Sequence, residues 1–135
     1  RFLLYLQPIV PLTSSDHYPV YEALIRLSED DNVIIPPGAF LPAAERYNLM
    51  PTIDNWVIDN LLGSRAVREK IKQYPKTLYH INLSGTSLNN SELSEILEDK
   101  FKRNNISPAN ICFGVTLTMV TAFVPRSVKR GSFSK

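Results

Sequence analysis

The sequence is poor in cysteine and has no long apolar segment. Cys112 is the only cysteine, so the chain by itself can form neither an internal disulfide nor a cysteine metal site. Its place in an apolar run favours a buried structural thiol. No apolar run approaches the roughly 18 to 20 residues that span a membrane, and the first residues lack the basic-then-apolar pattern of a signal peptide. We therefore expect a cytoplasmic protein with no membrane span in this chain.

Acidic residues are absent from the last quarter of the chain. All 13 acids lie at or before Asp99, together with eight Lys and Arg, so this stretch carries a charge of −5, and seven further basic residues follow it. A basic end can indicate nucleic acid or an anionic membrane as partner. The four basic residues between positions 126 and 135 are few and carry little aromatic interleaving. We therefore expect no nucleic-acid binding.

The overall composition is that of one globular domain, with 44% hydrophobic and 21% charged residues in a chain of 135. Arg1 stands first, directly before an apolar strand that opens at Phe2, so we expect a chain cut from a longer protein with an upstream domain. Regular patterning is lost after Met119, where proline, glycine and serine interrupt it. We expect one folded unit over residues 1–121 and an irregular or disordered basic tail over 122–135.

Strand and helix patterns alternate along the chain, which predicts a parallel α/β architecture. The first two strands are joined by a short polar stretch, so they form an antiparallel pair. A helix should begin at Pro36 and Pro37, and a longer one should be capped by Thr52 and extend to about Ile71. A third helix covers residues 91–103, with acids early and basic residues late. The predicted strands are 2–10, 20–27, 78–84 and 111–118.

Each of the last three predicted strands has one apolar face and one face that carries polar residues, because side chains alternate along a strand. Polar groups at strand ends around a shared interior are typical of the mouth of a (β/α) barrel, where such folds hold their chemistry. The faces that carry the polar residues comprise Glu22, Leu24 and Arg26, then His80, Asn82 and Ser84, then Gly114, Thr116 and Thr118.

Five short motifs occur in a fixed order along the chain. They are Gln7-Pro8-Ile9-Val10, Tyr21-Glu22-Ala23-Leu24-Ile25-Arg26, Phe40-Leu41-Pro42-Ala43-Ala44-Glu45-Arg46, Ile53-Asp54-Asn55-Trp56-Val57 and Ile81-Asn82-Leu83-Ser84. Together these motifs resemble the EAL domain family. The resemblance covers roughly residues 2–121, and the joint occurrence of the motifs at family-like spacing is what makes it specific.

The resemblance implies a partial TIM-like (β/α) barrel with an antiparallel first strand, about four strands and three to four helices. It implies a place in bacterial cyclic di-GMP signalling, in which the family hydrolyses cyclic di-GMP to linear pGpG with Mg²⁺ or Mn²⁺. Paired cations of this kind neutralise charge and activate water. The partners that it implies are cyclic di-GMP, an upstream sensor or GGDEF-type domain, and a second copy in a homodimer.

Specific residues take family positions in this resemblance. Glu22 and Asn82 match metal ligands. Gln7, Leu24, Arg26 and Pro42 match positions that contact the dinucleotide, and a guanidinium such as that of Arg26 can bind phosphate oxygens in a bidentate manner.

The residues taken alone allow simpler interpretations. Glu22 and Arg26 can form an ordinary ion pair of small energy, and Asn82 can cap a turn. His17 and His80 lack metal-ligand spacing to another histidine, so we assign both to structure. Asp54 and Trp56 are also interpreted as structural, with the indole in the core and the acid near a helix start.

The fourth strand departs from the family, which carries Glu-x-Thr-Glu-Thr where this chain reads Gly114-Val115-Thr116-Leu117-Thr118. The third metal-ligand position is therefore Gly114, and later catalytic elements of the family are absent. A whole TIM barrel needs about 250 residues. We expect a degenerate N-terminal half in which hydrolysis is lost, with a non-catalytic cyclic di-GMP binding module or a dimerising module as alternatives. Truncation, divergence and a shifted reading frame are the three alternative origins of this departure from the family.

Overall fold

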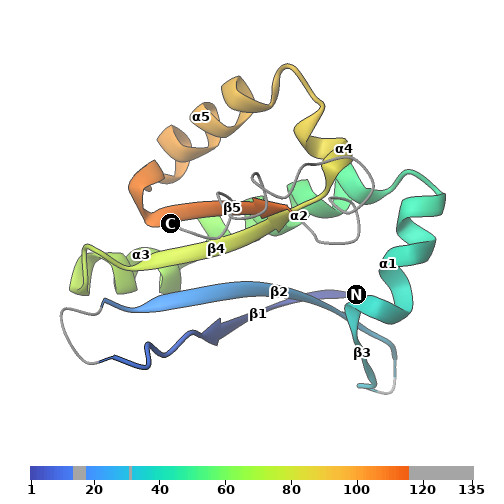
Figure 1. The fold of residues 1–135 in the computed structure, drawn as a ribbon, viewed down its shortest axis with the longest axis horizontal. Coiled ribbons are helices and arrows are strands. Elements are labelled where there is room, and N and C mark those ends of the chain that lie inside the picture. The colour runs from blue at the N-terminus through green and yellow to red at the C-terminus, as the bar shows by residue number, and fades with distance from the viewer. Residues whose placement is uncertain (14–17, 31, 116–135) are drawn as a thin grey trace.

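The computed structural model describes residues 1–13, 18–30 and 32–115, which form one mixed sheet with helices (Figure 1). The sheet has five strands in the order β1-β2-β4-β5, and the short β3 pairs with β2 off this path. β1 is antiparallel to β2, whereas β2, β4 and β5 are parallel. The predicted α/β class and antiparallel first strand are confirmed. The strands are β1 Phe2–Pro8, β2 Val20–Ser28, β3 Ile34–Ile35, β4 Leu78–Leu83 and β5 Ile111–Val115.

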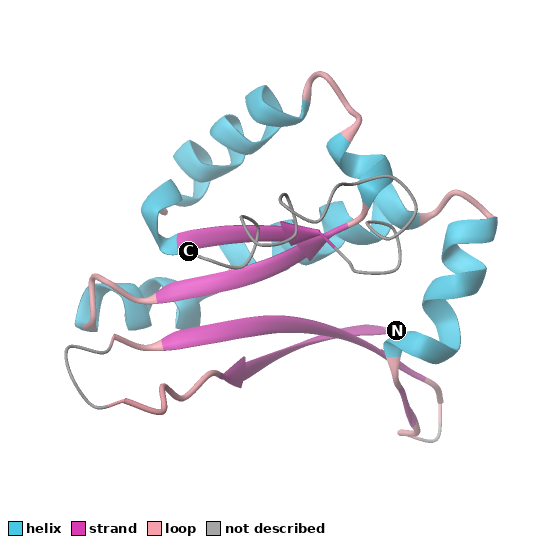
Figure 2. Cartoon of the chain, in the orientation of Figure 1, coloured by secondary structure: helices cyan, strands magenta, loops and turns pink. Residues whose placement is uncertain are grey.

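Helices follow the strands and pack on one face of the sheet. Figure 2 shows β2, β4 and β5 running in the same direction, toward the end of the molecule where α1 and α4 lie. Polar residues near the carboxyl ends of these strands are therefore brought to one region. The helices are α1 Pro37–Arg46, α2 Met50–Leu62, α3 Arg65–Gln73, α4 Gly85–Leu88 and α5 Leu93–Asn104, with a 3₁₀ turn at Pro108–Asn110.

The core lies between the apolar face of the sheet and helices α2, α3 and α5. Tyr79, Ile81 and Leu83 of β4 are at most 2% exposed, whereas the alternate residues His80 and Asn82 are half-buried. The core side chains of β4 pack against α2, for example at Leu61. Burial of one such side chain stabilises the fold by about 1.5–3 kcal/mol. The predicted division of β4 into an apolar and a polar face is confirmed.

The prediction of one long helix from Thr52 to about Ile71 is wrong. Helix α2 begins at Met50, two residues before the expected cap, and Leu49 at its N-cap makes no side-chain hydrogen bond. Proline in the first turn needs no amide partner, which suits an early start. The helix ends at Leu62 with Gly63 as its C-cap, and Ser64 then caps α3 by accepting a hydrogen bond from the Val67 amide at 3.4 Å. The Gly63-Ser64 pair is a stop signal followed by a start signal.

Two short elements were not predicted. Strand β3 has only two residues and exists through antiparallel pairing with Leu27 and Ser28. Helix α4 has four residues and follows a Ser84 cap. The predictions for the strand end at 116–118, for His17 and for the tail at 122–135 lie outside the described residues. Within the part of the chain that the structure describes, no helix has the length and apolar character to cross a membrane.

Candidate functional site

Glu22 and Asn82 meet on the polar face of the sheet, although 60 residues separate them in sequence. Strands β2 and β4 are adjacent and parallel, with Ala23 opposite Ile81, so side chains on the same face of the two strands are brought within reach. The Asn82 Nδ2 group donates a hydrogen bond to Glu22 Oε1 at 3.0 Å. Both residues are half-buried. The sheet therefore presents a carboxylate and an amide as one connected polar group.

Gly114 of β5 joins the same place from the next strand. It lies opposite Asn82 in the parallel register of β4 and β5. A Cβ atom added at Gly114 would have Asn82 Oδ1 as its nearest neighbour, at 3.4 Å. The three sequence positions predicted to hold metal therefore converge, but the third contributes no side-chain oxygen.

Gln7 and Leu24 lie beside this polar group. Gln7 of β1 is exposed and stands opposite Glu22 in the antiparallel register. Leu24 and Asn82 both line a cavity of about 200 Å³ between the sheet and helices α1 and α2. The rest of the lining is mostly apolar, and it includes Leu41 and Met50. The polar group thus borders a small space suited to an apolar or aromatic group.

Arg26 carries a positive charge on the same face of β2. Its Nη1 atom donates a hydrogen bond to the Ile25 carbonyl at 2.8 Å, and its guanidinium carbon lies 5.9 Å from the centroid of the Tyr5 ring. This contact is a cation–π interaction near its outer limit. Glu22 is not an ion-pair partner of Arg26, so the simpler interpretation of these two residues is wrong. The guanidinium is oriented by its neighbours and keeps donors for a ligand.

Pro42 is not brought to this group of residues. It lies inside α1 on an exposed side, whereas its neighbour Leu41 lines the cavity. The contact between Pro42 and a dinucleotide stays a prediction.

A second buried polar network supports the end of β4, and the sequence analysis missed it. Asp54 of α2 is 5% exposed, and its Oδ2 atom accepts hydrogen bonds from Ser84 N at 2.9 Å, Ser84 Oγ at 2.6 Å and Ser87 Oγ at 2.6 Å. Ser84 was expected on the polar face but is fully buried against α2, because the chain turns into α4 directly after β4. An acid on the apolar stripe of a helix was the signal available in the sequence.

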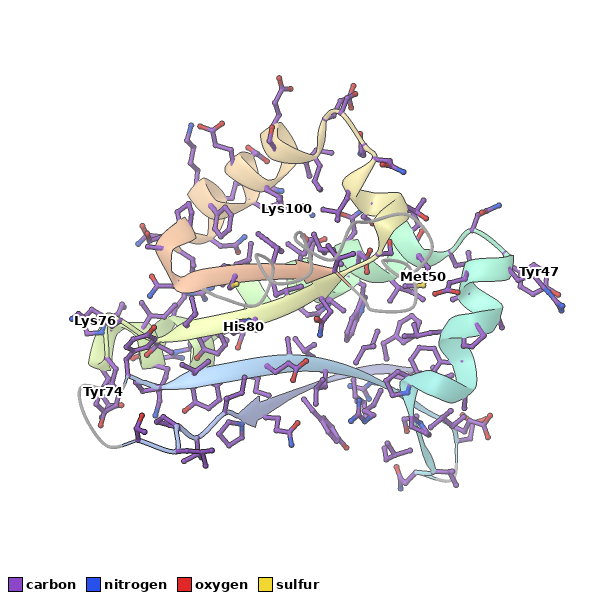
Figure 3. All side chains as sticks on the ribbon, in the orientation of Figure 1. Tyr47, Met50, Tyr74, Lys76, His80 and Lys100 are labelled. Carbon is purple, nitrogen blue, oxygen red and sulfur yellow. The ribbon has the colours of Figure 1, made fainter. Side chains whose placement is uncertain are left out.

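His80 and Cys112 lie on the same face of the sheet, in the row that contains Glu22. His80 lies opposite Glu22, Cys112 lies opposite His80, and Figure 3 labels His80 on β4. Cys112 is partly rather than fully buried, and burial raises the pKa of its thiol. Across residues 1–13, 18–30 and 32–115, no cluster of three His, Cys, Asp or Glu side chains is arranged to hold a metal ion.

The described side chains do not fit the pair of divalent cations that the family resemblance implies. Mg²⁺ and Mn²⁺ favour several oxygen ligands, chiefly carboxylates. Glu22 offers one carboxylate, Asn82 offers one amide oxygen, and Gly114 offers none. Such a set can support at most one largely hydrated ion.

Known proteins resemble this chain in sequence. The sequence profile of the EAL domain matches residues 1–126. The cyclic di-GMP phosphodiesterase PdeB of Shewanella oneidensis is 34% identical over 118 residues, which cover 87% of this chain and 14% of that protein. The cyclic di-GMP phosphodiesterase PdeF of Escherichia coli is 30% identical over 116 residues, which cover 86% of this chain and 15% of that protein. The chain therefore spans a small part of these curated relatives.

Solved structures show the same architecture. The FimX EAL domain from Pseudomonas aeruginosa, bound to c-di-GMP, matches with a TM-score of 0.74 and 28% identity over 91% of this chain and 48% of that chain. The PaMucR phosphodiesterase in its c-di-GMP complex matches with a TM-score of 0.76 and 26% identity over 97% of this chain and 51% of that chain. The predicted partial TIM-like barrel is confirmed, and the chain spans about half of each solved chain.

Proposed function

Because the chain belongs to the EAL domain family, we propose that the polar ends of β2, β4 and β5 form part of a binding site for cyclic di-GMP. We propose further that these 135 residues bind the dinucleotide without hydrolysing it. The names of the relatives and the ligands of the solved neighbours support the choice of dinucleotide. The hydrolysis of whole relatives is not carried over to this chain.

The meeting of Glu22, Asn82 and position 114 is the observation that carries this proposal. A hydrogen bond of 3.0 Å joins the first two across neighbouring strands, and position 114 faces the amide oxygen of Asn82. An inherited site accounts for this convergence better than chance, because the three residues come from three separate strands. Because Gly114 has no side-chain oxygen to hold a cation, the site is suited to binding rather than to hydrolysis.

Hydrolysis of a phosphodiester requires an activated water and stabilisation of the charge that develops on phosphate. Divalent cations supply both in enzymes of this chemistry. One carboxylate and one amide oxygen do not hold a cation pair, and Glu22 already accepts a hydrogen bond from Asn82. We therefore assign these residues to ligand contact and assign no reaction step to them.

Arg26 and Leu24 suit the two chemical parts of a cyclic dinucleotide. The guanidinium of Arg26 can bind phosphate through two parallel hydrogen bonds, and no carboxylate neutralises it among the described residues. Leu24 lines the cavity of about 200 Å³, whose apolar wall can receive the face of a base. Gln7, exposed opposite Glu22, adds an amide at the border of the site.

Calorimetric titration of the chain with cyclic di-GMP tests the proposal. We expect saturable binding that weakens at least tenfold in Arg26→Ala, since a charged hydrogen-bonding partner of phosphate contributes about 1.5–3 kcal/mol. Arg65→Ala is the matched control, because Arg65 is an exposed arginine on α3 whose ion-pair partner among the described residues is Glu69 at 3.9 Å. Folded protein that gives no heat at millimolar ligand would exclude binding. Conversion of cyclic di-GMP to pGpG by the chain in Mn²⁺ would exclude the non-catalytic assignment.

Self-association through β1 is the second candidate function, as in the predicted dimerising module. β1 pairs only with β2, so its other edge is open within the described sheet. The strand contains no charged residue, and Tyr5 and Leu6 on it are exposed. Open uncharged edges pair readily with other chains. Analytical ultracentrifugation that finds a dimer in the unaltered chain and a monomer in Leu6→Lys would favour this function.

A further inference from the structure

The carboxylate of Asp54 links helix α2 to the end of β4 through a buried network. Its Oδ2 atom accepts three hydrogen bonds, one from the Ser84 amide and one each from the Ser84 and Ser87 hydroxyls. Ser84 Oγ in turn accepts a hydrogen bond from the Ser87 amide at 3.2 Å, which caps α4. All three residues are buried, with Ser84 at 0% exposure. The turn from β4 into α4 is therefore fixed to α2 by polar contacts.

This network lies next to the proposed site. Ser84 is two residues after Asn82, and Leu83 between them is 1% exposed in the core. Asp54 and Asn82 also line the same cavity. The chain is thus held at Asn82 by the sheet register with Gly114 and two residues later, at Ser84, by the Asp54 carboxylate. A shift of the turn would move Asn82 away from Glu22.

We propose that Asp54 is a positioning residue, which holds the end of β4 so that the Asn82 side chain faces Glu22 and position 114. This inference rests on the proposed function for its relevance to cyclic di-GMP. Its physical basis is independent of any ligand, because charge-assisted hydrogen bonds to a buried carboxylate are short and strongly oriented. Residues that hydrogen-bond to metal ligands and orient them change metal affinity or activity by about 10- to 100-fold when replaced, and Asp54 stands in a comparable relation to Asn82.

The Asn82 side-chain amide gives a direct readout in the free protein. We expect Asp54→Asn to move the Asn82 Nδ2–H resonances toward those of a solvent-exposed amide in ¹⁵N–¹H spectra, because its hydrogen bond to Glu22 weakens. Ser87→Ala removes one donor to Asp54 and should produce a smaller shift in the same direction. Ser87→Thr restores a hydroxyl and should return the resonances toward their original positions.

Asp59→Asn is the matched control, since it removes a carboxylate from the same helix whose partner, Lys100, lies outside the network of Asp54. Asp59 forms an ion pair with Lys100, which is 8% exposed on the side of α5 that faces the sheet (Figure 3). We expect this variant to lower stability but to leave the Asn82 resonances unchanged. Equal shifts in Asp54→Asn and Asp59→Asn, or no shift in either Asp54→Asn or Ser87→Ala, would overturn the proposal.

Ligand titration then separates this inference from the proposed function. At a temperature where every variant is folded, we expect the Kd for cyclic di-GMP to rise at least tenfold in Asp54→Asn and to stay within twofold in Asp59→Asn. If the unaltered chain binds no cyclic di-GMP, the proposed function fails, and the Asn82 resonances still decide whether Asp54 positions that side chain. An unchanged Kd in Asp54→Asn, with binding intact, would overturn the positioning role.

Discussion

Replacement of Gly114 by glutamate should strengthen divalent-cation binding at Glu22 and Asn82, because it adds the carboxylate that position 114 does not supply. The φ angle of Gly114 is not in the left-handed region, so a side chain is tolerated by the backbone. A Cβ atom there would lie 3.4 Å from Asn82 Oδ1, an ordinary contact, so a side chain at position 114 would begin beside Asn82, whose amide is bonded to Glu22. Gly114→Glu therefore adds a second carboxylate to a site that already has one carboxylate and one amide oxygen.

The expected magnitudes follow from the position of the added charge. Two carboxylates a few ångströms apart repel by about 1 kcal/mol in water and about 4 kcal/mol near a protein surface. Since Glu22 is half-buried, we expect Gly114→Glu to lose about 1–2 kcal/mol of stability without metal. Mn²⁺ at about one hundred times its Kd would then add about 2.7 kcal/mol. In a domain of this size that energy raises Tm by roughly 10 °C.

Thermal unfolding followed by circular dichroism, with and without Mn²⁺, measures this effect. Gly114→Gln is the control, because it has the same length and no charge. We expect Mn²⁺ to raise Tm strongly in Gly114→Glu and by only a few degrees, or not at all, in Gly114→Gln and in the unaltered chain. If Mn²⁺ stabilises all three proteins equally, position 114 is not part of a metal-binding arrangement, and the proposed geometry of the site is refuted.

Two further predictions concern the core. Leu61→Ala should lower the free energy of unfolding by about 2–5 kcal/mol in urea denaturation, since Leu61 is 0% exposed and its removal leaves a cavity; a loss under 1 kcal/mol would contradict its central place in the core. Burial, followed by the nearby Tyr21 hydroxyl, raises the pKa of Tyr79 to about 12, so tyrosinate absorbance should show one group that titrates late and is missing in Tyr79→Phe. Because the folded pKa lies above the ordinary value near 10, the stability contributed by neutral Tyr79 is complete below about pH 10 and declines between about pH 10 and 12. A titration with no late group would contradict this burial.

The sequence was most informative where the pattern is local. Alternation along 78–84 predicted which face of β4 is apolar, and the family resemblance implied that Glu22 and Asn82 belong to one site. The hydrogen bond between Asn82 and Glu22 shows that the two side chains lie in contact. The roles of these residues in binding stay predictions until they are measured.

Other features depend on contacts between distant residues, and sequence patterns do not encode these. Strand β3 is two residues long and is defined only by its partner β2. Asp54 is separated from Ser84 by 30 positions and from Ser87 by 33 positions in the sequence. The network between them therefore cannot be predicted from the sequence of α2 or of α4 alone. The break between α2 and α3, in contrast, does have a local signal, the pair Gly63-Ser64. The helical spacing of apolar residues continues across this pair to Ile71, and for that reason the sequence analysis predicted one helix.

The orientation of the Asn82 amide sets what can approach it. Its nitrogen edge is occupied by Glu22, and its oxygen edge is turned toward position 114, where glycine leaves room. A carbonyl oxygen accepts hydrogen bonds from donors, attracts cations and repels other acceptors. A ligand group that approaches this oxygen from the β5 side must therefore be a hydrogen-bond donor, N–H or O–H, or a cation.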